Sequence, residues 1–273
     1  MKSRILVSVV GIPLLLYVVL AASPIILVAA LTVLNTIAAY ELQYCVTGGA
    51  KRGGRLGLVM AQAGLWPMLL YFFAPRYIPF YCVLEILLIF FVAILDTEIL
   101  KEKTVNAAQI MAGICTVVVI PYAFSAFIRM VQSGYHRAFL LLPFILSFAC
   151  DTFAYFTGMA IGKHKLAPLV SPKKTVEGSI GGLLGNVVCG EIFVLVMDRW
   201  FGGCGIGYGI MLLLALLCGV VAQLGDLSFS YLKREFGIKD YGHLFLEHGG
   251  VLDRFDSVLF VTPVLEIILS FVK

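Results

Sequence analysis

The chain consists mainly of long apolar segments joined by short polar connections, and these segments constrain its fold more than any other feature. A helix that crosses a bilayer needs about 20 mostly uncharged residues, because each backbone polar group must be satisfied within the segment once water is absent. Of the 273 residues, 61% are hydrophobic and 13% are charged, which lies outside the usual range of a soluble domain. The sequence therefore predicts an all-α integral membrane protein.

Nine segments are long and apolar enough to cross a membrane. The first also resembles a signal peptide, but a second apolar run follows it almost without a loop, so we interpret it as a retained helix. No soluble domain or internal repeat interrupts the chain, which predicts a single transmembrane domain over residues 1–273. The predicted helices are at about 5–22, 24–40, 56–73, 78–95, 107–128, 138–160, 178–197, 207–229 and 254–272.

The distribution of Lys and Arg predicts the orientation, because cytoplasmic loops carry the positive excess. With the N-terminus inside, fifteen of the 20 Lys and Arg residues lie on the inner side and five on the outer side. We therefore predict a cytoplasmic N-terminus in the inner membrane, with the charge-rich stretch 230–257 facing the cytosol. The net charge of +4 is modest and gives no reason to expect a nucleic-acid partner.

The end of the eighth segment carries a stripe of polar side chains. At about 100° per residue, these side chains fall within an arc of about 100° on one helix face. Ionisable groups at membrane depth are costly and usually functional, so the stripe favours a binding site over an Asp226 to Lys233 ion pair that merely ends the helix. Its members are Gln223, Asp226, Ser230, Lys233 and Arg234.

Three further carboxylates are candidate site residues. Asp253 and Asp256 follow Gly249 and Gly250, which permit a sharp turn back into the membrane. Capping of a helix start is an alternative role for Asp253, and the two roles can coexist. Asp151 lies inside the sixth segment, about 20 Å along the helix from its start, where interhelical hydrogen bonding is the alternative.

The loop after the sixth segment is rich in lysine. Lys173, Lys174 and Thr175 directly precede a helix start, which is a suitable place for phosphate groups. A lysine-rich anchor on the inner side is the alternative. Gly178, Gly182 and Gly185 have the spacing that permits close helix packing.

The cysteine and histidine residues do not indicate a metal centre. The seven cysteines show no C-x-x-C spacing and lie mostly in apolar runs, so we interpret them as structural thiols. His248 has no second His at a helical spacing, which argues against a zinc site. Two roles remain open for His248: contact with a phosphate group, or stabilising the shape of the loop.

The C-terminal motif resembles that of a known family. The run S-Y-L-K-R-E-F-G-I-K-D, followed by H-G-G-V-L-D-R-F-D, is similar to the signature of the phosphatidate cytidylyltransferases, or CDP-diacylglycerol synthases. The resemblance runs from about 151 to 257, with two departures: Leu246 and Glu247 replace a usual Pro-Gly, and Phe153 replaces a small residue. The matching positions are Ser230, Lys233, Arg234, Lys239, Asp240, His248, Gly249, Gly250, Asp253, Arg254 and Asp256.

The resemblance implies the reaction of CTP with phosphatidate to give CDP-diacylglycerol and pyrophosphate, assisted by a divalent cation such as Mg²⁺. The preferred metal ligands are Asp226 and Asp253, with Asp256 and Asp151 as further candidates. A bilayer location follows, and a homo-oligomer is compatible with the sequence. The residues expected to bind phosphates are Lys173, Lys174, Lys233, Arg234, Lys239 and Arg254; further substrate contacts are expected from Thr175, Ser230, Asp240, His248, Gly249 and Gly250.

Two other functions are considered. A related CTP-dependent lipid enzyme such as a polyprenol kinase would differ only in the acceptor lipid. A secondary transporter would also place charges in spans, but its site would lie near the midplane at a repeat interface. Here the charges gather at one face and the sequence shows no repeat, which favours the enzyme.

Overall fold

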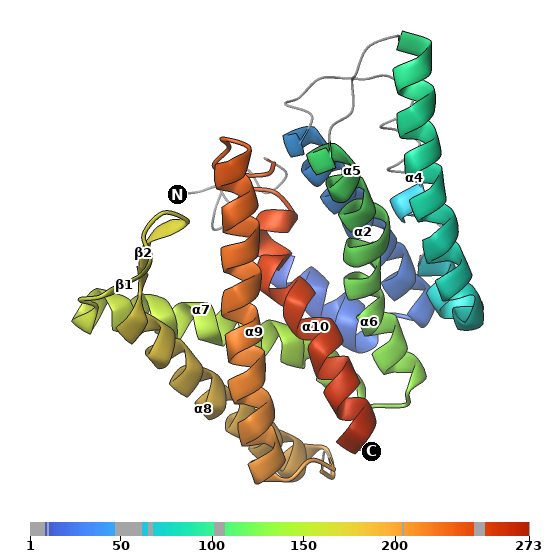
Figure 1. The fold of residues 1–273 in the computed structure, drawn as a ribbon. Helices are drawn as coiled ribbons and strands as arrows, with labels where there is room; N and C mark the ends of the chain where they lie inside the picture. The colour runs from blue at the N-terminus through green and yellow to red at the C-terminus, as the bar shows by residue number, and fades with distance from the viewer. Residues whose placement is uncertain are drawn as a thin grey trace. The chain divides into compact units, whose positions relative to one another are not determined.

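The computed structural model shows a helical protein (Figure 1). Its chain divides into two compact units. One unit contains Met1–Arg129 and Phe236–Asp253, and the other contains Met130–Glu235 and Arg254–Lys273. The last of the three boundaries along the chain falls within α10 (Leu252–Val272), between Asp253 and Arg254. The prediction of a single transmembrane domain stays a prediction. The structure describes residues 9, 11–46, 62–64, 68–100, 107–203, 205–242 and 249–272.

The first unit is built around three apolar helical stretches. The π-helical turn η1 (Tyr17–Ala21) precedes α2 (Pro24–Val46), and the 3-10 turn η2 (Pro75–Tyr77) leads into α4 (Ile78–Leu100). The third stretch comprises α5 (Ala107–Ile114), η3 (Cys115–Val119) and the start of α6 (Ile120–Gln132). Both α2 and α4 contact α5 and η3. Their shared core contains Ala39, Ala63 and Val117, flanked by Ile89 and Val118.

The second unit begins at the end of α6 and contains the longest helices. After η4 (Arg137–Leu141), α7 (Leu142–Ile161) begins with a proline in its first turn, where the missing N–H has no helical partner to lose. A hairpin then leads to α8 (Val176–Trp200), which is followed by α9 (Tyr208–Glu235) and α10 (Leu252–Val272). α7, α8 and α9 pack against one another, and the Phe229–Phe260 ring pair joins α9 to α10.

The hairpin is a feature that the sequence analysis did not predict. Strands β1 (Lys165–Ala167) and β2 (Ser171–Thr175) pair antiparallel, with Lys165 opposite Thr175 and Ala167 opposite Ser171. The amide of Val176 closes the hairpin by donating to the carbonyl of His164 at 2.9 Å. Since each strand has only one partner in this two-stranded sheet, Pro172 can lie in β2 without breaking a central ladder. The lysine-rich loop is therefore an ordered platform beside the start of α8.

The glycine spacing of α8 has the predicted packing role. A Cβ atom at Gly182 would lie 2.8 Å from the carbonyl oxygen of Cys150 on α7, so a side chain there would force the helices apart. Gly185 faces the ring of Phe153, which is one of the two departures from the motif pattern described above. The bulk of this phenylalanine is thus accommodated by a glycine on the facing helix.

Seven helical stretches in the described part of the chain are long and apolar enough to cross a membrane. They coincide with seven of the nine predicted segments, with several ends extended by a few residues. The first predicted segment is represented by a shorter apolar helix, Gly11–Ala21, and most of the third, 56–73, lies outside the described residues. The protein is thus a predominantly helical polytopic membrane protein, and the count of nine stays a prediction.

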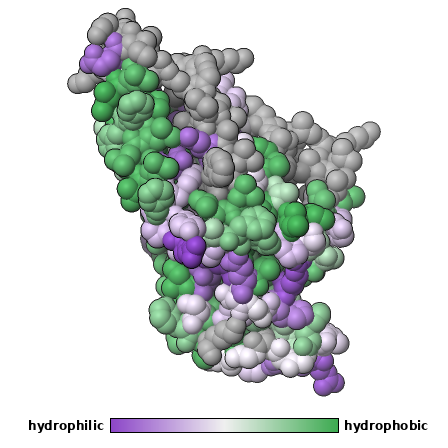
Figure 2. All heavy atoms as spheres, turned by 90° about the vertical axis from the view of Figure 1, so that its right-hand side faces the viewer, coloured by the Kyte–Doolittle hydropathy of each residue, from purple (hydrophilic) through white to green (hydrophobic). Residues whose placement is uncertain are grey.

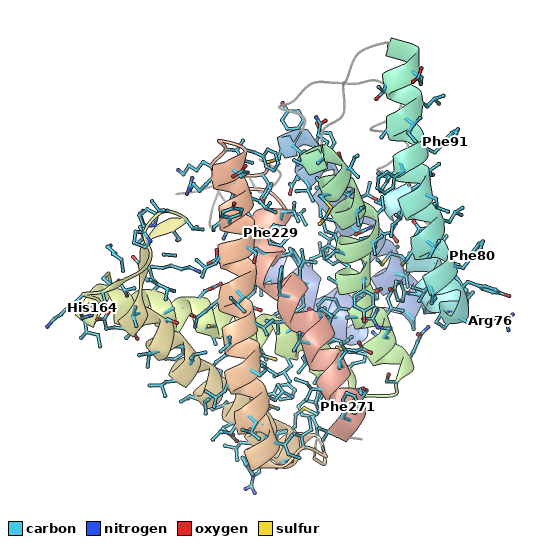
Figure 3. All side chains as sticks on the ribbon, in the orientation of Figure 1. Arg76, Phe80, Phe91, His164, Phe229 and Phe271 are labelled. Carbon is cyan, nitrogen blue, oxygen red and sulfur yellow. The ribbon has the colours of Figure 1, made fainter. Side chains whose placement is uncertain are left out.

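The surface of α4 has the character expected of a helix in contact with lipid. Only 11% of the most apolar part of the stretch Pro75–Leu95 is buried inside the protein. Phe80 and Phe91, which are 70% and 60% exposed, project outward from this helix (Figure 3). The face on the α4 side of the molecule carries broad hydrophobic areas (Figure 2). Exposed apolar area of this kind is unusual for a soluble monomer, which supports the membrane assignment.

Candidate active site

Asp226 occupies a central position among the predicted site residues. It lies on α9, and its carboxylate forms an ion pair with the ammonium group of Lys174 on β2. The same carboxylate accepts a hydrogen bond of 3.1 Å from the hydroxyl of Ser230, one helical turn further on. Asp226 therefore connects the hairpin to α9, and its role is not limited to ending its own helix.

A second predicted carboxylate, Asp151, reaches the same region from α7. It is close enough to Asp226, Lys174 and Arg254 to interact electrostatically with all three. Its side chain is solvent-accessible, because it opens into a cavity instead of packing between helices. Asp151 therefore lines the cavity, and both roles considered for it stay predictions.

The third carboxylate of this group is Asp256, on α10. It interacts electrostatically with Asp226, Asp151 and Lys233. The close approach of α10 to α9 has a local cause: a Cβ atom at Gly225 would lie 2.8 Å from the carbonyl oxygen of Asp256. The absence of a side chain beside Asp226 thus lets the two helices meet at the level of the carboxylates.

A cavity of about 440 Å³ lies between α7, α8, α9 and the hairpin. Its walls combine acidic, basic and apolar groups, among them Tyr155, Met159 and Leu166. The polar residues that line it include Asp151, Lys173, Lys174, Thr175, Gln223 and Asp226. The cavity thus combines cations suited to phosphate groups with carboxylates suited to a metal ion, beside helices that carry lipid-facing apolar surface.

Thr175 and Gln223 have structural contacts within this cavity wall. The hydroxyl of Thr175 caps α8 by accepting a hydrogen bond of 3.1 Å from the amide of Gly178. The side-chain NH2 group of Gln223 donates to the backbone carbonyl of Ser179 at 3.0 Å. The side-chain oxygen of Gln223 accepts a hydrogen bond from the hydroxyl of Ser179. These contacts hold the start of α8 against α9 and fix the direction in which the hairpin leaves it.

The remaining predicted cations are distributed over both units. Lys173 is exposed at the cavity, while the guanidinium of Arg234 donates to the carbonyl of Val170 at 3.3 Å, close to the hairpin turn. Arg234 therefore anchors the hairpin to α9 in this structure. Lys239 and Asp240 belong to the other unit, where both are exposed.

Asp253 lies in the first unit and contacts backbone amides. One of its carboxylate oxygens accepts hydrogen bonds from the amides of Tyr241 and Gly250, at 2.8 and 2.9 Å. Gly249 has φ of +82°, a conformation that favours glycine. The sharp turn is present, but Asp253 is the second residue of α10 and its two amide partners precede the helix, so it is not in the N-cap position. Joint metal binding by Asp253 and Asp226 stays a prediction. His248 lies outside the described residues.

The donor chemistry of the carboxylate cluster suits a hard divalent cation. Asp226 already holds one cation, the Lys174 ammonium, and Asp151 and Asp256 add two further carboxylates nearby. Oxygen ligands of this kind are those that Mg²⁺ prefers. Across the described ranges, no three acidic, histidine or cysteine side chains are arranged as a preformed cation site.

One buried carboxylate with a defined role was missed by the sequence analysis. Glu41, in α2, is 3% exposed and accepts hydrogen bonds from the amides of Val251 and Leu252, both at 2.9 Å. The signal that could have revealed it is a single acidic residue near the end of a long apolar helix, because such a group is costly unless it has partners.

The fold and the site together define a class of protein: a polytopic membrane protein with a cavity lined by lysines and carboxylates. The model of the cytidylyltransferase family matches residues 2–272, and the chain belongs to this family.

Three curated relatives show the extent of the similarity, and each is named phosphatidate cytidylyltransferase. The protein of Staphylococcus haemolyticus is 37% identical over 176 residues, covering 64% of this chain and 65% of the relative. The protein of Staphylococcus aureus strain COL is 38% identical over 176 residues, which again cover 64% of this chain and 65% of the relative. The Staphylococcus epidermidis protein is 44% identical over 131 residues, or 48% of each chain. The aligned part thus spans at most 65% of the length of these relatives.

Proposed function

We propose that this protein is a phosphatidate cytidylyltransferase that makes CDP-diacylglycerol from CTP and phosphatidate. An oxygen of the lipid phosphate forms a bond to the α-phosphorus of CTP, and the bond from that phosphorus to the leaving pyrophosphate breaks. The observation that carries the proposal is the cavity in which Lys173 and Lys174 lie beside the carboxylates of Asp151 and Asp226. Membership of the cytidylyltransferase family and the names of the relatives support it.

The residues of the cavity suit this reaction because its nucleophile is already an anion. No general base is required; the protein must instead overcome the repulsion between two polyanions and hold them in line. In the proposal Lys173 and Lys174 bind phosphate groups of CTP, while Lys233 and Arg254 neutralise charge near the lipid phosphate.

A divalent cation is part of the proposal, with Mg²⁺ as the ion that fits the donors. Asp226 and Asp253 are the preferred ligands, and Asp256 and Asp151 supply further carboxylates. When bound, the ion would neutralise developing charge on the phosphates. The carboxylate of Asp226, which would hold the ion, is paired with the Lys174 ammonium in this structure.

The position of a radioactive label tests the reaction directly. With purified protein, Mg²⁺ and phosphatidate, label at the α-phosphorus of CTP should enter the lipid product and label at the γ-phosphorus should leave as pyrophosphate. A polyprenol kinase would give the opposite pattern, with γ-label in the lipid. An acceptor panel of phosphatidate and polyprenol completes the test, and γ-label in the lipid fraction would exclude the proposal.

The hairpin lysines give a prediction about substrate binding. We expect Lys173→Ala or Lys174→Ala to weaken the use of CTP by about 1.5–3 kcal/mol, because each removes a charge-assisted contact to phosphate. The measurement is kcat/KM for CTP at saturating phosphatidate. Arg199→Ala is the matched control, since it removes an exposed cation at the far end of α8. If the double variant of Lys173 and Lys174 shows unchanged kinetics, these lysines do not bind CTP, and the hairpin is only a positively charged anchor on the inner side of the membrane.

We also propose nine transmembrane helices, a cytoplasmic N-terminus and a cytoplasmic active site in the inner membrane. The fifteen-to-five distribution of Lys and Arg supports this orientation. The seven helical stretches of the described chain are compatible with it.

Single cysteines in a cysteine-free background test the orientation. We expect cysteines at Lys173 and Lys239 to be protected from an impermeant thiol reagent in intact cells, and a cysteine at Arg76 to react. All three side chains are exposed, so protection would report the membrane and not burial in the protein. Permeabilised cells provide the control, in which all three should react. Labelling of the first two positions in intact cells would reverse the proposed topology.

A further inference from the structure

Glu41 and the second glycine of the His-Gly-Gly sequence are in direct contact. The carboxylate of Glu41 uses both oxygens, one for the amide of Val251 and one for the amide of Leu252, each at 2.9 Å. These amides belong to the first turn of α10 or directly precede it, where helical amides have no partner within the helix. The negative charge of a carboxylate also suits the positive end of a helix.

The chain closes around this carboxylate without leaving room for side chains. A Cβ atom at Gly250 would overlap the Glu41 carboxylate, and one at Gly242 would lie 2.5 Å from its Oε1 atom. Gly250 is not among the glycines with positive φ, whereas Gly249 is, at +82°. Gly250 therefore needs to be glycine because of the Glu41 carboxylate. Gly249 needs to be glycine for backbone conformation and because a Cβ atom there would lie 2.7 Å from the Asp253 carboxylate.

From this geometry we propose that Glu41 is a positioning residue for the turn that presents Asp253, and that Gly250 is glycine to admit the Glu41 carboxylate. Glu41 holds the amides of Val251 and Leu252, while Asp253 holds the amides of Tyr241 and Gly250. Two carboxylates thus fix consecutive backbone amides just before Asp253. The catalytic part of this inference rests on the proposed cytidylyltransferase activity; the structural coupling does not.

Glu41→Ala should lower kcat by about 10- to 100-fold, the range seen when a group that orients a functional carboxylate is lost. The KM for CTP should change by less than about twofold, because Glu41 is not among the residues proposed to bind CTP. Glu41→Gln should retain one of the two hydrogen bonds and give an intermediate loss. A merely structural role would reduce the amount of folded protein without this selective effect on kcat per folded molecule.

A double-variant cycle tests the coupling to Gly250. Gly250→Ala alone should lower the thermal midpoint and kcat, but in the Glu41→Ala background it should have little further effect, because the overlapping carboxylate is gone. Gly249→Ala is the control, since its strain comes from backbone conformation and from the Asp253 carboxylate, and should be equally harmful in both backgrounds. The measurements are thermal unfolding of detergent-purified protein and CDP-diacylglycerol formation.

The possible outcomes separate the two proposals. Additive effects of Glu41→Ala and Gly250→Ala on the thermal midpoint, or an unchanged kcat in Glu41→Ala, would overturn the positioning role. A wild-type protein that makes no CDP-diacylglycerol would instead refute the proposed function, and the thermal cycle would still decide whether Glu41 and Gly250 are coupled. If Glu41→Ala does not fold, Glu41→Gln replaces it in the same cycle.

Discussion

Asp226→Asn should reduce CDP-diacylglycerol formation at least about 100-fold, equivalent to about 2.7 kcal/mol of transition-state stabilisation. The substitution preserves the size of the side chain and an acceptor for the Ser230 hydroxyl, but removes the charge that holds Lys174. In the proposed reaction that charge is also required to bind the divalent cation. We expect the loss to appear in kcat and in the Mg²⁺ dependence, measured as initial rates over a range of Mg²⁺ concentrations.

Excess Mg²⁺ should restore only part of the activity, because the missing property is ligand charge and not side-chain shape. The folded state should persist, since a partly exposed ion pair contributes only about 1 kcal/mol. Asp198→Asn is the matched control: it removes an exposed carboxylate near the end of α8, remote in sequence from the hairpin. Near-normal rates for Asp226→Asn at ordinary Mg²⁺ concentrations would remove Asp226 from the metal site.

Asp253→Asn is the second substitution with a large expected effect. We expect it to abolish CDP-diacylglycerol formation, because Asp253 is a preferred metal ligand in the proposal. The variant keeps an oxygen that can accept from the amides of Tyr241 and Gly250, so the turn should retain most of its structure. The measurements are CDP-diacylglycerol formation over a range of Mg²⁺ concentrations and the thermal midpoint of the purified protein.

The two roles of Asp253 predict different combinations of results. Loss of a hydrogen bond to a backbone amide costs about 1 kcal/mol of stability without a specific effect on metal dependence. Loss of a metal ligand removes activity while the thermal midpoint stays close to that of the wild type. If Asp253→Asn keeps near-normal activity and Mg²⁺ dependence but unfolds at a lower temperature, Asp253 only stabilises the backbone and its assignment as a ligand is wrong.

Much of the secondary structure could be predicted from local sequence because membrane helices satisfy their own backbone groups. Segments such as 107–128 and 254–272 contain enough consecutive apolar residues to specify a helix without reference to any partner. The observed stretches, Ala107–Gln132 and Leu252–Val272, agree closely. The helical stripe from Gln223 to Arg234 was also predictable, since α9 continues to Glu235.

The hairpin was less predictable because its strands are short and obtain their hydrogen bonds from each other. Residues 163–175 contain four lysines, two prolines and a Ser-Pro pair, which indicate a polar loop as well as a strand pair. Pairing of Lys165 with Thr175 depends on the positions at which α7 ends and α8 begins. Those positions follow from the packing of the two helices through their glycines.

The sequence alone predicted which residues would carry the proposed chemistry, because ionisable groups at membrane depth are rare and the C-terminal motif is long. Only the tertiary structure decided how they are paired: Asp226 with Lys174 of the hairpin, Arg234 with the carbonyl of Val170, and Asp253 with two backbone amides. It also revealed Glu41, more than two hundred residues before its partners Val251 and Leu252. Such contacts depend on how helices pack, and helix packing is decided by side-chain shapes across distant segments, whereas the helices themselves follow from local hydrogen bonding in an apolar solvent.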